Sequence, residues 1–252
     1  MVYFVGAGPG AADLITVRGA ELLKKADLVI YAGSLVNPEL LRYTKKSCKI
    51  LNSAAMTLEQ VAAAMVAAQE AGGLVVRLHT GDPSIYGAVR EQMVLLDEQK
   101  IPYQVVAGVS SFCGAAASLK TEYTLPGVSQ TVIISRMAGR TPVPPREEIA
   151  QLASHGTTMV LFLSAGLLET LSSELQKGGC PSETPAAIVY KATWPDEKIV
   201  RTSVAKLASA ATENGIEKTA LILVGNFLGD GFDRSKLYDP SFTHGFRQAE
   251  RS

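Results

Sequence analysis

The sequence predicts an α/β protein built from two α/β domains, and three observations support this prediction. Short runs of aliphatic and β-branched residues alternate with helical stretches over nearly all 252 residues. The strand-like runs have few polar interruptions, which is typical of sheets covered on both faces. The alternation breaks between residues 119 and 130 and then resumes. We therefore predict domains at residues 1–124 and 125–252.

The first domain contains four predicted strands and helices with recognisable ends. Asn37 before Pro38 is typical of a helix start. Thr57 and Gln60 form a capping box, and the glycines at 72 and 73 end that helix. The strands are predicted at 3–5, 28–31, 74–78 and 103–106, with a further helix at 17–26. Strands that alternate with helices indicate a mostly parallel sheet with right-handed crossovers.

The second domain repeats the alternation, with a proline-rich loop at residues 139–145 after its first strand. Strands are predicted at 131–135, 158–163, 186–190, 198–202 and 220–224, and helices at 167–177 and 204–214. The last twenty residues, rich in Asp, Phe and Gly, predict an irregular tail.

Composition and charge disfavour several classes of function. Lys plus Arg and Asp plus Glu both total 24, so the basic excess typical of nucleic-acid binders is missing. Three widely spaced cysteines without a CxxC pair argue against a disulfide framework, and we expect buried or inert thiols. Three dispersed histidines predict no metal site. The start of the chain does not resemble a signal peptide, and no apolar run approaches a membrane span, so we expect a cytoplasmic protein.

A glycine-rich turn follows the first predicted strand, at residues 5–12. It matches a loose dinucleotide fingerprint, but a convincing helix begins only at Val17 instead of at the glycines. The second strand also ends without the carboxylate that would hold a ribose. The sequence therefore disfavours an NAD or FAD dehydrogenase, and a tight turn accounts for the glycines.

Two more motifs follow predicted strands. In the first, residues 77–87, Gly81 allows close approach of a ligand to the backbone, and Asp82 is able to accept hydrogen bonds. A loop that caps the next helix explains this segment equally well. In the second, residues 107–112, Phe112 stands where a serine-hydrolase nucleophile elbow needs glycine.

Taken together, these motifs resemble the tetrapyrrole (precorrin) methyltransferases. The segments VGAGPGAADLIT, GDPSIYG and AGVSSF occur in the order of that family, and the resemblance covers essentially the whole chain. The segments YAGSL, GRTPVP, YKATWP and SKLY are similar to the branch that methylates C11 of precorrin-4 or cobalt-precorrin-4 in cobalamin biosynthesis. Methylation of another precorrin carbon or of uroporphyrinogen III stays open, as does a non-catalytic nucleotide-binding module.

The resemblance implies a class III methyltransferase in which S-adenosyl-L-methionine binds in a cleft between two α/β domains and leaves as S-adenosyl-L-homocysteine. It also implies a homodimer. Carried over by motif, the cofactor positions are Pro9, Thr80, Gly81, Asp82, Ile85, Ser110, Ser111, Leu163 and Ala192. Relatives often have Met at the position of Leu163, and leucine preserves the apolar contact.

The implied reaction is attack of a ring carbon on the sulfonium methyl, without a metal or a covalent enzyme intermediate. Asp82 is the most plausible polar contributor to catalysis. The many carboxylates of the substrate call for positive charge, and Arg136, Arg140 and Arg146 follow the predicted domain boundary. Weaker candidates are His79, Arg90, Lys120 and Lys191. Whether the natural ring carries cobalt stays open.

Overall fold

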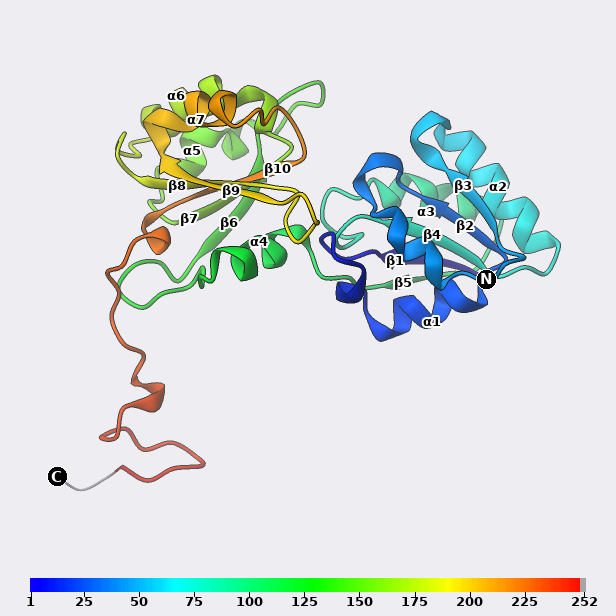
Figure 1. Cartoon of the computed structure of the whole chain (residues 1–252), viewed down its shortest axis with the longest axis horizontal. Coiled ribbons are helices and arrows are strands. Elements are labelled where there is room, and N and C mark those ends of the chain that lie inside the picture. The colour runs from blue at the N-terminus through cyan, green and yellow to red at the C-terminus, as the bar shows by residue number, and fades with distance from the viewer. Residues whose placement is uncertain (250–252) are drawn as a thin grey trace. The chain divides into compact units, whose positions relative to one another are not determined.

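The structure, a computed structural model, describes residues 1–249 and separates into two compact units (Figure 1). The first unit contains Met1–Leu119 together with Val189–Lys198, and the second contains Lys120–Ile188 and the chain from Ile199 onward. The segment Val189–Lys198 thus belongs to the first unit although it lies far along the chain. A domain boundary between residues 124 and 125 stays a prediction.

Five strands form the sheet of the first unit, in the order β3-β2-β4-β1-β5. They are β1 (Val2–Gly6), β2 (Leu28–Tyr31), β3 (Lys49–Asn52), β4 (Val75–His79) and β5 (Tyr103–Val106). Every neighbouring pair is parallel, as expected from the alternation with helices. Strand β3 was not predicted, because it is an edge strand with mostly exposed residues and no apolar run.

Helices cover both faces of this sheet. These helices are α1 (Val17–Lys25), α2 (Leu58–Glu70) and α3 (Val89–Glu98), and the first unit also contains α4 (Ser111–Leu119). Helix α1 packs on one face through Leu23, and α2 and α3 pack on the other through Met65 and Leu96. The capping box of Thr57 and Gln60 is confirmed. The helix predicted after Asn37 is a 3-10 helix, Pro38–Tyr43.

The strand order places a ligand-binding position at the carboxyl ends of β1 and β4. These strands are neighbours, but the chain leaves β1 toward β2 and leaves β4 toward β5, in opposite directions along the sheet. Such a switch point leaves a crevice outside the strand ends, where ligands bind in open α/β sheets.

The sheet of the second unit has the order β6-β7-β10-β8-β9. Its strands are β6 (Val132–Arg136), β7 (Thr158–Phe162), β8 (Pro185–Tyr190), β9 (Lys198–Ser203) and β10 (Ala220–Val224). Strands β6 and β7 are parallel, whereas β7 and β10 are antiparallel, so the expectation of a mostly parallel sheet is wrong here. One reason was visible in the sequence, since the chain between β8 and β9 is too short for a helical crossover.

Three helices, α5 (Ile149–Ala153), α6 (Leu168–Lys177) and α7 (Leu207–Glu213), lie together on one face of this second sheet (Figure 1). The expected irregular tail is confirmed up to residue 249, since this part contains one 3-10 helix, Lys236–Tyr238, and one isolated bridge between His244 and Arg247. All three cysteines are free thiols, of which Cys48 and Cys180 are half-buried and Cys113 is exposed. No helix within residues 1–249 is both long and apolar enough to cross a bilayer.

Candidate active site

The loops that follow β1 and β4 are hydrogen-bonded to each other at the switch point. The Ala7 N–H donates to the His79 carbonyl at 2.7 Å. Gly8 and Gly81 exchange two backbone hydrogen bonds, with N···O distances of 3.2 and 2.8 Å. Three backbone bonds therefore hold the glycine turn against the GDPSIYG loop, which brings the first two sequence motifs together.

Glycines let the ends of three strands approach each other backbone to backbone. A Cβ atom built on Gly6 would lie 2.5 Å from the Gly108 Cα. One built on Gly108 would lie 2.2 Å from the Gly81 carbonyl oxygen. Neither position has room for a side chain, so glycine is required where β1, β4 and β5 end.

The Asp82 carboxylate connects the loops after β4 and β5. One oxygen accepts a hydrogen bond from the Gly108 N–H at 2.7 Å, and the other accepts from the N–H and hydroxyl of Ser84. Burial opposes the charged form, but the hydrogen bonds from Ser84 and Gly108 outweigh it and hold the Asp82 pKa below its usual value. Both oxygens are therefore committed to positioning the loops. The catalytic role suggested for Asp82 stays a prediction.

We expect Asp82→Asn to destabilise the protein at pH 7 by about 1.5–3 kcal/mol, the range for hydrogen bonds to a charged group. Because the folded-state pKa is depressed, this stabilisation is complete above the unfolded value of about 3.9 and is lost as the pH falls through the folded pKa. Urea unfolding at pH 7 and below pH 4 measures the difference between wild type and variant. A difference that does not change with pH would contradict this role.

Three hydroxyl groups close to Asp82 make no hydrogen bond to the described residues. They belong to Thr80, which follows β4, and to Ser110 and Ser111 at the start of α4. Gly81 faces these serines, because a Cβ atom built on it would lie 3.4 Å from the Ser111 nitrogen. The residues predicted from the second and third motifs are thus adjacent, and their hydroxyls can bind a ligand.

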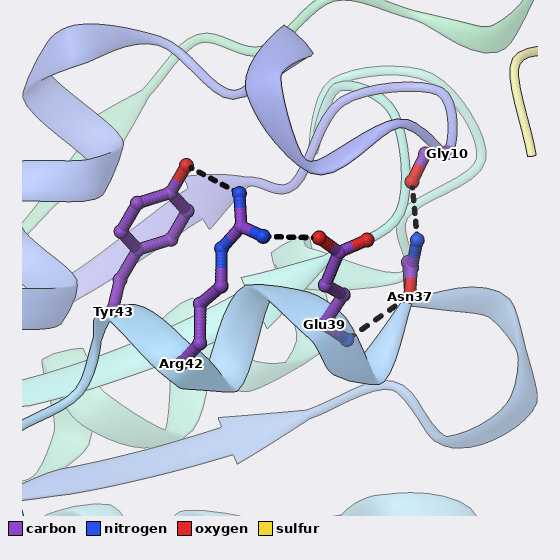
Figure 2. A network of polar contacts seen from close by, with 5 residues as sticks. All are labelled: Gly10, Asn37, Glu39, Arg42 and Tyr43. Atoms are coloured by element: carbon purple, nitrogen blue, oxygen red, sulfur yellow. Dashed lines mark hydrogen bonds and ion pairs between the residues drawn. The ribbon is translucent and has the colours of Figure 1, made fainter.

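Side chains anchor the backbone of the glycine turn from two directions. The Trp194 Nε1–H donates to the Pro9 carbonyl at 3.2 Å, and the Asn37 Nδ2–H donates to the Gly10 carbonyl at 2.9 Å (Figure 2). The Thr193 Oγ1 accepts from the Ala11 N–H at 2.9 Å. The N–H groups of Ala7, Gly8 and Ala11 are occupied and Pro9 has none, so the turn offers few of the backbone donors with which a dinucleotide fingerprint binds a pyrophosphate.

Figure 2 also shows how Asn37 is held in place. Its Oδ1 accepts a hydrogen bond from the Glu39 N–H at 3.0 Å, which caps the 3-10 helix. Within that helix Arg42 pairs with Glu39 and approaches the Tyr43 hydroxyl at 3.5 Å. The ion pair is about half exposed, so we assign most of the anchoring to the cap.

The segment that carries Trp194 has an unusual backbone. Lys191 and Thr193 have φ values of 46° and 67°, in the left-handed region that a β-branched threonine rarely adopts. The Glu197 carboxylate supports this conformation by accepting hydrogen bonds from the Thr193 N–H and the Ser118 hydroxyl, both at 2.5 Å. Strained loops that are held this firmly are typical of functional sites.

Within this segment Ala192 is buried, and its carbonyl oxygen would lie 2.7 Å from a Cβ atom on Gly10. Lys191 was a weaker candidate for substrate binding, but it pairs with Asp196 at 2.5 Å and lies over the Trp194 ring. Sequence reasoning missed the anchoring roles of Trp194 and Asn37. For Trp194 the YKATWP segment indicated a resemblance without a contact, and Asn37 was predicted only as a helix start.

The other predicted cofactor residues differ in position. Pro9 is buried, and a Cβ atom on Gly114 of α4 would lie 2.7 Å from its ring. Ile85 lies in the turn that follows Asp82 and donates its N–H to the Asp82 carbonyl at 3.2 Å. Leu163 belongs to the second unit, directly after β7, and combines a φ of 53° with 67% exposure. An exposed leucine in a strained backbone at a strand end is a candidate contact residue.

The three arginines predicted to bind substrate do not form one cluster with free charges. Arg136 donates to the Met137, Thr141 and Pro142 carbonyls at 2.9–3.1 Å, so its guanidinium holds its own loop together. Arg140 and Arg146 are exposed and make no hydrogen bond to the described residues. Arg90 and Lys120 are also exposed. No group of three or more metal-ligating side chains is found within residues 1–249.

Comparison with known proteins places the chain in a family. The sequence profile of the tetrapyrrole (corrin/porphyrin) methylases matches residues 1–208. The chain belongs to this family. It is 50% identical over 251 residues to a cobalt-precorrin-4 C(11)-methyltransferase of Methanocaldococcus jannaschii, covering 99% of this chain and 97% of the relative. A precorrin-4 C(11)-methyltransferase of a Sinorhizobium species is 42% identical, with 98% of each chain covered.

Solved structures of family members share the fold. A cobalamin biosynthetic enzyme, cobalt-precorrin-4 methyltransferase, superposes with a TM-score of 0.89 at 48% identity, covering 91% of this chain and 96% of that one. The uroporphyrin-III C-methyltransferase of Thermus thermophilus in complex with S-adenosylhomocysteine has a TM-score of 0.75 at 25% identity, covering 90% and 92%. The predicted fold class and family are confirmed.

Proposed function

We propose that this tetrapyrrole methylase transfers a methyl group from S-adenosylmethionine to C11 of precorrin-4 or cobalt-precorrin-4 in cobalamin biosynthesis. The observation that carries the proposal is 50% identity over 251 residues to a curated enzyme of this activity. The matched region covers 99% of this chain and therefore includes the glycine turn, both strand-end loops and the strained segment around Trp194. Part of the proposal is that the chain acts as a homodimer in the cytoplasm.

The residues at the switch point fit S-adenosylmethionine chemically. An amphipathic nucleoside with an amino-acid tail needs apolar surface together with hydrogen-bonding groups. Pro9 and Ala192 supply buried apolar surface, and the unused hydroxyls of Thr80, Ser110 and Ser111 supply donors and acceptors. S-adenosylmethionine, when bound, supplies an activated methyl group on a sulfonium sulfur.

The chain's own contribution to the reaction is alignment and exclusion of water. Reacting atoms must be held roughly 3–3.5 Å apart, so the loops that hold the ligands have to be rigid. Asp82 fixes the loop after β5 to the loop after β4, and Trp194 and Asn37 fix the glycine turn. Leu163, which is exposed, is a further apolar cofactor contact in this proposal.

The substrate's acetate and propionate groups need cationic partners, and we assign Arg140 and Arg146 to this role. Both are exposed and uncommitted, whereas Arg136 is occupied by carbonyl groups. Replacing either one with alanine should raise the KM for the tetrapyrrole about fivefold at low salt, because an exposed ion pair contributes up to about 1 kcal/mol.

The effect of each substitution should shrink as salt is added, and the affinity for S-adenosylmethionine should stay unchanged. Arg136→Ala is the comparison variant, and we expect it to lower the melting temperature because three hydrogen bonds to the loop are lost. Unchanged kinetics of both exposed-arginine variants across a salt series would show that the carboxylates bind elsewhere.

A substrate panel tests the proposed function. The protein is incubated with labelled S-adenosylmethionine and, in separate reactions, precorrin-4, cobalt-precorrin-4 and uroporphyrinogen III. We expect label in one or both precorrin-4 forms. Label in uroporphyrinogen III alone would favour the second candidate function, which the fold of the Thermus thermophilus enzyme supports.

A further inference from the structure

A cavity of about 250 Å³ lies in the first unit, on the face of the sheet covered by α2 and α3. It is bordered by the ends of β2 and β4, the first turns of both helices and the loop before α3. Its volume is several times the roughly 30 Å³ that one water molecule occupies in the liquid. Thr80 also lines it, so the cavity adjoins the loop that carries the candidate cofactor residues.

Arg77 lines this cavity as a buried cation without an anionic partner. The residue is only 6% exposed, and burial lowers its pKa to about 10, so it stays charged at neutral pH. Its Nε donates to the Gln92 side chain at 2.9 Å, and its Nη1 donates to the Ile30 carbonyl at 3.2 Å. Its Nη2 makes no hydrogen bond to the described residues, and no described carboxylate lies within 4 Å.

His79 adds a second unsatisfied group to the same wall. It is 4% exposed, and its Nε2 is buried without a hydrogen-bond partner among the described residues. Burial and the nearby charge of Arg77 lower the His79 pKa to about 3, so the ring is neutral and can donate one hydrogen bond. An unpaired buried cation and an unpaired buried polar nitrogen are both costly without a ligand.

The surroundings of the cavity favour an anion. The first turns of α2 and α3 line it, and the amino ends of helices carry partial positive charge. Glu91 is the one carboxylate in the lining, and it is exposed and not paired with Arg77. Planar guanidinium groups bind carboxylates through two parallel hydrogen bonds.

We propose that this cavity binds a carboxylate arm of a reaction ligand through Arg77, with His79 as a second donor. The inference rests on the proposed function, which supplies two sources of that carboxylate. One is an acetate or propionate group of the tetrapyrrole, and the other is the amino-acid carboxylate of the methyl donor. Both present the same chemistry to the cavity, and the test below separates them.

Leu35 provides a test that leaves Arg77 intact, because it lines the cavity and is 44% exposed. Leu35→Glu and Leu35→Gln have nearly the same shape and differ by one negative charge. The affinity for S-adenosylhomocysteine is measured by calorimetry, and the affinity for the tetrapyrrole by absorbance titration. We expect Leu35→Glu to bind one of these ligands about tenfold more weakly than Leu35→Gln, with a smaller ratio at high salt.

The ligand that is weakened identifies the source of the carboxylate. Val94→Glu and Val94→Gln, on α3 outside the cavity lining, control for a general effect of added charge. Arg77→Gln should weaken the same ligand at least tenfold, and Arg77→Lys should recover part of the affinity.

The proposal is overturned if both ligands bind Leu35→Glu and Leu35→Gln equally, or if the Val94 pair shows the same ratio. These binding readouts do not depend on turnover. A wild-type protein that transfers no methyl group would contradict the proposed function, whereas equal binding by the Leu35 pair would contradict only the cavity assignment.

Discussion

Gly81→Val should weaken binding of S-adenosylhomocysteine at least about a hundredfold, equivalent to about 2.8 kcal/mol. Gly81 has a φ of 59°, which a β-branched residue rarely adopts. Its Cβ atom would itself be tolerated, at 3.4 Å from the Ser111 nitrogen, but the valine methyl groups would extend into the space beside Ser110 and Ser111. Calorimetry on the folded variant measures the loss.

Gly72→Val is the matched control for backbone strain. Gly72 has a φ of 79°, and a Cβ atom built on it would meet nothing within 4 Å. It ends α2 away from the candidate site. Both variants should lose about 1–2 kcal/mol of stability from the left-handed backbone. Only Gly81→Val should lose binding, and wild-type affinity in this variant would remove the GDPSIYG loop from the site.

Trp194→Ala should release the glycine turn and weaken S-adenosylhomocysteine about tenfold or more, or about 1.4 kcal/mol. The indole packs directly on Gly10, where a Cβ atom would lie 2.1 Å from the ring, and its N–H holds the Pro9 carbonyl. The variant loses both interactions. Calorimetry and thermal unfolding, measured on the same preparation, separate the loss of affinity from the loss of stability.

Trp194→Phe separates the two contributions of the indole. It keeps most of the packing and removes the hydrogen bond, which contributes about 1 kcal/mol. We expect it to bind with an affinity between those of wild type and Trp194→Ala. If both variants bind S-adenosylhomocysteine as wild type does, the segment around Trp194 does not position the glycine turn.

The fold was largely predictable, because local signals determine most of its elements. The capping box at Thr57 depends on residues three positions apart, and the buried strands β1 and β2 appear as continuous apolar runs. Strand β3 lacks such a run, since an edge strand needs no buried side chains. The antiparallel pairing of β7 with β10 depends on contacts between distant segments and has no local signal.

The candidate site was predictable only where a single loop carries the chemistry. The glycine turn and the loop around Asp82 are conspicuous because strand ends and glycines coincide there. The contact of Trp194 with Pro9 joins residues 185 positions apart, so no spacing rule could have revealed it. Arg136 was a reasonable substrate candidate by charge, but its hydrogen bonds to three nearby carbonyls became visible only in three dimensions.

The position of the new methyl group tests the central claim most directly. The protein is incubated with precorrin-4 or cobalt-precorrin-4 and S-adenosylmethionine carrying a ¹³C-labelled methyl group, and the product is examined by NMR. Our account predicts one enriched methyl carbon, bonded to C11 of the macrocycle. Enrichment at any other ring carbon, or an unlabelled ring after incubation with both forms, would contradict it.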